Sequence, residues 1–260
     1  MSVNEQEQLD WLRLIRSDNV VPATFNRLLE FYGSAGRALT ALPELAKRGG
    51  RKRPLKACDE KTAITEFKAL KKYGGQWLTQ NDPRYPKHLS SIHDAPPILA
   101  VLGDIDLLEK PGLGIVGARN ASIGGRKIAA RFADDVGAQG FPIISGLARG
   151  IDTSAHQSSL QHGTVAVVAG GVDVIYPEEN KDLYAEIAKY GAIVAESPFG
   201  TPPDRRHFPK RNRIIAGLSY GVLVVEAAQK SGSLITANMA LDYGREVYAV
   251  PGSPLDPRAG

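Results

Sequence analysis

Residues 113–250 alternate between short apolar runs and longer segments with helical spacing, and this alternation limits the possible folds more than any other feature of the chain. Most of the apolar runs are continuous, as expected for strands that are buried on both faces of a parallel sheet. Strands that alternate with helices are typical of α/β proteins. The sequence therefore predicts a doubly wound, mostly parallel, Rossmann-like sheet. The predicted strands are 113–117, 142–147, 164–169, 192–196, 221–226 and 246–250, and the predicted helices are 124–138, 152–162, 181–190, 211–219 and 233–243.

The N-terminal part of the chain has a different pattern. Residues 9–46 contain apolar side chains at helical spacing, divided into short helices by Pro22 and by the Gly-Ser-Ala-Gly turn at 33–36. Short helices around such a turn resemble a helix-hairpin-helix or sterile-alpha-motif (SAM-like) module, and a further helix is predicted at 60–73. We therefore predict three parts. They are a small all-α domain at 1–73, an extended connector at 74–112 with a short strand at 76–79, and the Rossmann-like domain at 113–260.

Composition narrows the class of protein. The single cysteine, Cys58, excludes an internal disulfide and a cysteine-rich zinc site, and it fits a cytoplasmic protein. The first residues are polar and acidic, unlike a secretory signal. No apolar run approaches the roughly 20 residues that cross a bilayer, so no membrane association is expected. The excess of basic residues lies in 1–80, so the larger part of the chain would bind a polyanion only through a local patch.

The most concentrated patch is 204–213, Asp-Arg-Arg-His-Phe-Pro-Lys-Arg-Asn-Arg, where a predicted strand ends and a helix begins. Guanidinium groups beside a phenyl ring suit a ligand with several phosphates and exposed bases. A solvated basic loop is the alternative, but the position of this run on the sheet favours a binding site. A second basic stretch, 47–56, contains no acid and could contact phosphates, although a solvated loop is the simpler interpretation.

Ligands of doubly wound sheets bind at the carboxyl ends of the strands, and these ends converge on one rim. Here they carry glycine and serine, whose unblocked N–H and hydroxyl groups suit phosphate at helix N-termini, together with basic side chains. The sequence therefore predicts an anion-binding rim. Its candidate residues are Gly117, Arg119, Ser145, Gly146, Arg149, Lys181, Phe208, Lys210, Arg211, Asn212, Arg213, Ser231, Gly232 and Ser233.

No catalytic or cofactor motif accompanies this rim. Residues 112–117 spell Gly-x-Gly-x-x-Gly, but these glycines fall within the first predicted strand rather than in the turn that follows it. The sequence has no Walker lysine motif, no nucleophile elbow and no His or Cys cluster with metal spacing. Glu226, at a strand end, could serve as a general base, and His156, His162 and His207 are also available, but no pair among them has a spacing that demands catalysis. We expect no cofactor, no metal, no catalytic residue and no enzymatic activity.

Several of these segments together resemble the DprA (Smf) family of DNA-processing proteins. The matching segments are 82–86, 117–119, 145–152, 176–177, 208–219, 231–237 and 251–253. The resemblance implies a protein that binds and protects single-stranded DNA, loads the RecA recombinase during natural transformation, and forms a homodimer through its Rossmann-like domain. It also implies a DNA pocket. The pocket would use Arg119, Lys181, Phe208, Arg211 and Arg213, framed by Ser145-Gly146 and by 231–233.

The chain departs from the family pattern in two places. It has Gly-Ala-Arg at 117–119 where many members have Gly-Ser-Arg, and it stops at Gly260 where many continue into a winged-helix domain. The alternative function is a nucleotide-processing enzyme, because the sheet also resembles phosphoribohydrolases that act on nucleoside monophosphates. In that group a glutamate follows a Pro-Gly-Gly-x-Gly-Thr loop, whereas Glu226 precedes the loop at 231–233. The order of these elements favours the binding protein.

Overall fold

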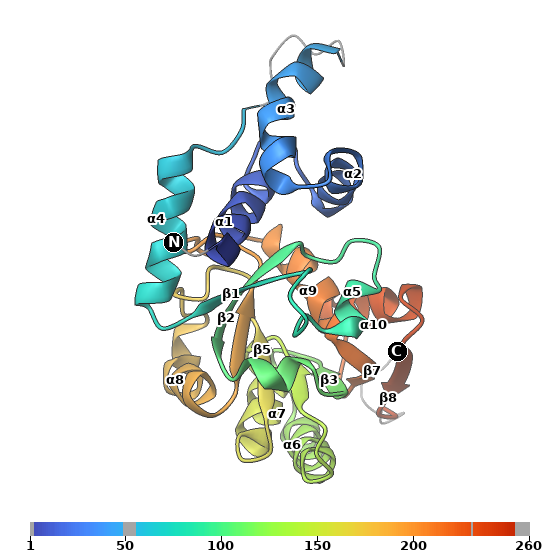
Figure 1. Cartoon of the computed structure of the whole chain (residues 1–260). Coiled ribbons are helices and arrows are strands. Elements are labelled where there is room, and N and C mark those ends of the chain that lie inside the picture. Colours follow the sequence, from blue (N-terminus) through green and yellow to red (C-terminus); the bar gives the residue numbers. More distant parts are fainter. Residues whose placement is uncertain (1–2, 49–55, 230, 253–260) are drawn as a thin grey trace.

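The computed structural model describes residues 3–48, 56–229 and 231–252. It shows a central sheet with helices on both faces and a helical module above one end (Figure 1). Most of the basic stretch 47–56 lies outside the described residues, as does Ser253 of the resembling segment 251–253. None of the described helices is both long and apolar enough to span a bilayer.

Four helices form the N-terminal module, as predicted, and their ends follow from local sequence. Pro22 starts the second helix, where its missing N–H is not needed. Gly33 ends that helix in a left-handed conformation with φ 76°, and its N–H is donated to Leu29 O. The Asp59 carboxylate caps the fourth helix by accepting the Thr62 N–H. The helices are α1 (Val3–Ile15), α2 (Pro22–Tyr32), α3 (Ala35–Arg48) and α4 (Glu60–Lys72).

Over the described residues, the sheet has eight strands in the order β1-β2-β6-β5-β4-β3-β7-β8. The six strands from β3 onward pair in parallel, which confirms the predicted mostly parallel sheet. Two further strands pair antiparallel at the β6 edge, and both lie in the segment predicted to be an extended connector. The strands are β1 (Gln76–Thr79), β2 (Ile98–Gly103), β3 (Gly112–Val116), β4 (Ile143–Ser145), β5 (Thr164–Val167), β6 (Ala192–Ala195), β7 (Ser219–Val224) and β8 (Glu246–Ala249).

The helices between the parallel strands divide into two layers (Figure 1). One layer consists of α6 (Ile123–Gly137), α7 (Ile151–Ser159) and α8 (Lys181–Tyr190), which pack side by side. The other layer contains α5 (Lys87–Ser90), α9 (His207–Leu218) and α10 (Gly232–Asp242). The strand order reverses at β3, whose neighbours are β4 and β7, and the helices change face there. A ligand site is expected beside this reversal.

Helix α9 begins four residues earlier than the sequence predicted. The predicted helix starts at residue 211, whereas α9 starts at His207, so most of the basic run is helical rather than a loop. Pro209 is tolerated because it lies in the first turn, where N–H groups have no acceptor within the helix. The buried residues Ile214, Ile215 and Leu218 fix the helix against the sheet. The basic side chains therefore have fixed directions.

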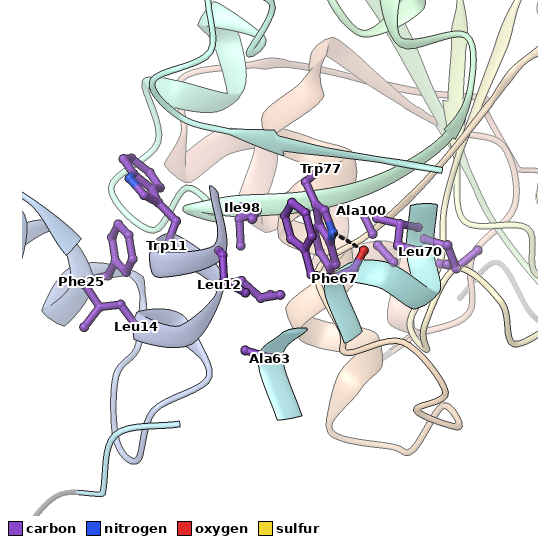
Figure 2. Packing of buried hydrophobic residues seen from close by; sticks show 14 of the residues in the cluster. Trp11, Leu12, Leu14, Phe25, Ala63, Phe67, Leu70, Trp77, Ile98 and Ala100 are labelled. Carbon is purple, nitrogen blue, oxygen red and sulfur yellow. Dashed lines mark hydrogen bonds between the residues drawn. The ribbon is translucent and has the colours of Figure 1, made fainter. Parts of the chain in front are cut away.

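The helical module is attached to the sheet through an apolar cluster (Figure 2). The Trp77 ring of β1 stacks on Phe67 of α4 at 6.1 Å between centroids, and its indole N–H is donated to Phe67 O at 3.3 Å. Leu12 of α1 and Ile98 of β2 belong to the same cluster. Each large side chain buried here contributes about 1.5–3 kcal/mol. This packing fixes the module above the start of α9.

Candidate functional site

Two cavities open at the carboxyl ends of the parallel strands. The first, about 270 Å³, lies beside the end of β5 and is named the β5 cavity. The second, about 250 Å³, lies between the end of β3 and the start of α10 and is named the α10 cavity. Both are partly lined by Arg119, Phe208 and Arg211. These three side chains therefore form the boundary between the two cavities.

Arg211 is the most unusual residue of this boundary. Only 7% of it is exposed, and burial lowers the pKa of its guanidinium to about 10. Within the described part of the chain no ion pair is formed by Arg211, and its Nε has no hydrogen-bond partner. Asp152 favours the charge of Arg211 electrostatically. Since a buried cation without a direct partner is unfavourable, the position suits an anionic ligand.

The Asp152 carboxylate is engaged with the backbone. Its Oδ2 accepts the N–H of Gly146 at 3.1 Å and that of Ala148 at 3.3 Å. Burial raises the pKa of Asp152, and the positive charge of Arg211 opposes that shift. Gly150 is the N-cap of α7, and Asp152 lies in the first turn of that helix. The role of Asp152 is to hold the loop after β4 under Arg211.

Phe208 lies between the two cations of the boundary. Its ring centroid is 5.1 Å from the Arg119 guanidinium and 5.9 Å from that of Arg211. Tyr176, half exposed on the opposite wall of the β5 cavity, has its ring 6.0 Å from Phe208 at an interplanar angle of 55°. The site thus combines two aromatic faces with two positive charges.

The loop that carries Arg119 is held by Glu226 at the end of β7. One Glu226 carboxylate oxygen accepts the Ser122 N–H at 3.0 Å and the Ser122 hydroxyl at 2.9 Å. The Glu226 carbonyl accepts the Ala118 N–H at 2.6 Å. Gly117, between β3 and this loop, lines the α10 cavity. The residue that the sequence singled out as a candidate base therefore fixes a binding loop.

The loops at 145–146 and 231–233 differ in which polar groups remain available to a ligand. Ser145 is fully buried and donates its hydroxyl to Ile115 O at 2.6 Å, and the Gly146 N–H is already bound to Asp152. A phosphate cradle at 145–146 was the expectation, but the polar groups there are used within the sheet. Ser231 caps the start of α10, and its Oγ lies 2.8 Å from that of Ser233. A Cβ at the exposed Gly232 would meet no atom within 4 Å, so this helix start is accessible.

Arg213 and Asn212 have internal partners. The Arg213 side chain is 9% exposed, forms an ion pair with Glu196 at the end of β6, and donates to Asp94 O at 2.6 Å. It therefore joins α9 to the sheet, and its charge is compensated within the fold. The Asn212 amide donates to Gly232 O at 3.2 Å and links α9 to the start of α10. The sequence predicted binding roles for both residues. Asn212 lines the α10 cavity with its amide N–H already engaged, whereas Arg213 lines neither cavity.

The remaining basic candidates surround the site at different distances. Arg149 lines the β5 cavity and forms an ion pair with Glu179, both largely exposed. Lys181 is exposed at the start of α8 and does not line either cavity. Lys210 is exposed one residue before Arg211 and faces a third cavity, described below. The structure thus brings Arg119, Phe208 and Arg211 together and leaves Lys181 at the margin.

The sequence missed one wall of this site. Tyr176 and Pro203 line the β5 cavity, although neither is basic or preceded by a glycine motif. The signals for Tyr176 were its position shortly after a strand end and its place in the family-like segment 176–177, but it was not among the candidate site residues. Within the described ranges, no group of three or more His, Cys, Asp or Glu residues is arranged to hold a metal ion.

Two models of known protein families match this chain. A family model described as DNA recombination-mediator protein A matches residues 76–260, and one described as the DprA-like N-terminal HHH domain matches residues 5–69. The chain belongs to the DNA recombination-mediator protein A (DprA) family, as its motifs suggested. The HHH match also confirms the predicted helix-hairpin-helix type of the N-terminal module.

Curated relatives support this assignment. Protein Smf of Synechocystis sp. is 39% identical over 95% of this chain, and the DNA processing protein DprA of Bacillus subtilis is 45% identical over 74%. The chain spans 65% and 66% of the length of these two relatives, which is slightly less than two thirds.

Two solved structures share the fold. The DNA processing protein A of Streptococcus pneumoniae matches with a TM-score of 0.83 and 34% identity, over 100% of this chain and 90% of that protein. The DNA processing protein A of Helicobacter pylori, studied for its single-stranded DNA binding mode, matches with a TM-score of 0.64 and 30% identity. That match covers 69% of this chain and 83% of the other. The predicted α/β fold with a helical N-terminal module is therefore confirmed.

Proposed function

We propose that this protein binds single-stranded DNA across the boundary between the β5 cavity and the α10 cavity. One observation carries the proposal: Arg211 is buried, lacks an ion-pair partner among the described residues, and lies beside the Phe208 ring and Arg119. A phosphate beside the Arg211 guanidinium would supply the missing partner through charge-assisted hydrogen bonds, and Arg119 would hold a neighbouring phosphate. The accessible start of α10 adds backbone N–H donors on the same side.

The β5 cavity is suited to a nucleobase. Its volume of about 270 Å³ is slightly below the roughly 300–1,000 Å³ typical of sites for drug-sized molecules, as suits a ligand as small as one base. The apolar part of its wall includes Val168, Tyr176 and Phe208, and three arginines complete the lining. A base can stack on such aromatic rings only when it is unpaired, which gives selectivity for single strands without a preferred sequence.

We also propose that the protein acts as a recombination mediator. In this role it protects incoming single-stranded DNA and loads RecA during natural transformation in the cytoplasm. The support is the family membership together with the DNA-binding relative from Helicobacter pylori. No enzymatic step is included, because the candidate base Glu226 has its carboxylate engaged with Ser122. Absence of free-base release from a nucleoside monophosphate would agree with this part of the proposal.

A homodimer through the Rossmann-like domain is part of the same proposal. β8 is the end strand of the sheet, and the apolar residues Leu241 of α10 and Tyr248 of β8 are 60% and 52% exposed beside it. Two copies joined there would let one DNA strand occupy two sites and bind with higher apparent affinity. Sedimentation at micromolar concentration tests this part, and a monomer would exclude it.

The decisive experiment is a titration of oligothymidylate and duplex DNA at several salt concentrations. Arg119, Arg211 and a third nearby cation should each neutralise one phosphate. The salt slope, which is the slope of the logarithm of the binding constant against the logarithm of the salt concentration, is then expected to be about −2 for a single strand. Arg211→Gln should flatten that slope by about 0.7 and weaken binding at all oligomer lengths. Equal affinity for duplex and single strand would contradict the proposal and leave only a non-specific basic patch.

A further inference from the structure

A third cavity lies between the N-terminal module and α9. It has a volume of about 410 Å³ and is named the interdomain groove. One side is formed by the α1–α2 end of the module, and the other by the first two turns of α9, which lie below it in Figure 1. The groove shares Val168, Ala169 and Arg211 with the β5 cavity, so the two are adjacent. Arg211 is the residue that lines this groove as well as both cavities of the proposed DNA site.

The charges in the groove leave a local positive excess. Arg213 forms ion pairs with both Glu196 and Asp94, so this group keeps one negative charge, and Arg16 is paired with Glu66 through bonds of 2.9–3.3 Å. Lys210 lines the groove, is exposed, and forms no ion pair within the described part of the chain. Arg211, 7% exposed and without a partner at Nε, also faces it. Lys210 and Arg211 thus exceed the one carboxylate charge left over at Arg213, and the groove keeps one net positive charge on the α9 side.

The opposite wall offers donors and an apolar surface. Val21 and Pro22 start α2, and the Val21 side chain, 56% exposed, provides no capping hydrogen bond. No side chain of the described residues caps the N–H groups of Ala23 and Thr24, which point out of the helix start. Ala23 is itself exposed and lines the groove. An uncapped helix start opposite Lys210 and the buried Arg211 forms a site for a phosphate.

We propose that the interdomain groove is a further nucleotide subsite, in which the start of α2 and Lys210 hold the next phosphate of the same DNA strand. This inference rests on the proposed function, because the strand must first occupy the Arg211 boundary. Val21 and Pro22 provide the apolar surface for the adjoining base or sugar. The N-terminal module thus takes part in DNA binding through α2, and the Trp77–Phe67 packing and the Phe199 N–H bond to the Glu66 carboxylate keep it in place.

The test introduces a negative charge where the phosphate is expected. Ala23→Asp places a carboxylate at the start of α2, which stabilises the helix through its dipole and repels phosphate. The melting temperature should therefore be unchanged or higher while DNA binding weakens. Ala23→Asn is the neutral control of the same shape. Thr40→Glu adds the same charge at an exposed position of α3 that does not line the groove.

Binding is measured by fluorescence anisotropy with oligothymidylates from about 2 to about 12 nucleotides. The loss caused by Ala23→Asp should grow with oligomer length and reach about threefold to tenfold for the longest, with a flatter salt slope. Lys210→Gln should give the same length dependence, whereas Ala23→Asn and Thr40→Glu should follow the wild type. Suppose that the wild type binds oligothymidylate, and that Ala23→Asp and Lys210→Gln have the wild-type affinity at every oligomer length. The subsite is then excluded, and the proposed function stands. If the wild type binds no single strand, the proposed function itself fails.

Discussion

The guanidinium of Arg211 lies where a Cβ would stand at Gly146. The side chain thus packs directly on the backbone of the loop after β4, and only a glycine leaves that space. Because Asp152 holds the same loop through the Gly146 N–H, the loop cannot easily move away. The sequence suggested that Gly146 is small so that phosphate can approach the backbone. In the structure, the missing side chain at Gly146 instead leaves room for the Arg211 guanidinium.

Gly146→Ala should therefore act through Arg211. The added methyl group displaces the guanidinium from the boundary of the two cavities, and the expected loss is one charge-assisted interaction of about 1.5–3 kcal/mol. Single-strand affinity should fall about 10- to 100-fold. Gly124→Ala, on the exposed start of α6 with only Ser122 Oγ near, is the matched control. Wild-type affinity of Gly146→Ala in the anisotropy assay would show that the position of Arg211 is not critical.

Phe208→Ala should separate stacking from electrostatics. Loss of a base–aromatic contact should weaken single-strand binding by about 1–3 kcal/mol, while the salt slope stays almost unchanged because no charge is removed. Phe31→Ala, at a ring that is 81% exposed on α2, serves as the control. A lower melting temperature with unaltered DNA affinity would instead make Phe208 an anchor of α9.

Arg213→Met should reduce stability rather than DNA affinity. Removing the guanidinium leaves the Glu196 carboxylate largely buried without its partner, at a cost of about 3–5 kcal/mol. The double variant Arg213→Met/Glu196→Gln should recover part of this loss, since the uncompensated charge is gone. Urea denaturation measures the free energy of unfolding, and the salt slope of oligothymidylate binding should match that of the wild type. A slope flattened by about 0.7 would instead assign Arg213 a phosphate contact.

His156 should make stability fall in mild acid. It is fully buried on α7, and burial lowers its pKa from 6.5 to about 3. Thr164 donates its hydroxyl to Ile143 O at 3.0 Å, so the His156 Nδ1–H must donate to Thr164 Oγ1 at 2.7 Å, and Nε2 is buried without a partner. As the pH falls, His156 is therefore protonated near pH 6.5 in the unfolded state but only near pH 3 in the folded state.

This difference predicts that the free energy of unfolding falls by about 2 kcal/mol between pH 7 and pH 5. In His156→Leu, the difference in the free energy of unfolding between pH 7 and pH 5 should be smaller by that amount. Denaturation at the two pH values measures it. His162→Gln, at a half-buried residue near the end of the same segment, is the control for general effects of removing a histidine. An identical pH dependence in wild type and His156→Leu would show that His156 becomes charged in the folded protein.

The sequence by itself determined the parallel part of the fold. Continuous apolar runs separated by helical spacing identify β3 to β8 and the helices between them. Burial on both faces excludes most polar residues from the inner strands, whereas β8 is a largely exposed edge strand. It did not reveal β2, whose partner β6 follows some ninety residues later in the chain. A short apolar run between Pro97 and Gly103 becomes a strand only when that partner is present. Local pattern alone cannot supply this information.

The general location of the site was also available from the sequence, since the carboxyl ends of parallel strands meet at one rim. Which cations are free there was decided by tertiary structure. Arg211 and Arg213 are two residues apart in one basic run, yet Arg213 is paired with Glu196 and Arg211 faces the cavities without an ion-pair partner in the described chain. Side chains on a helix two residues apart point in different directions, and what each meets depends on strands and loops distant in sequence. The sequence specifies the charges, and packing decides which of them remain for a ligand.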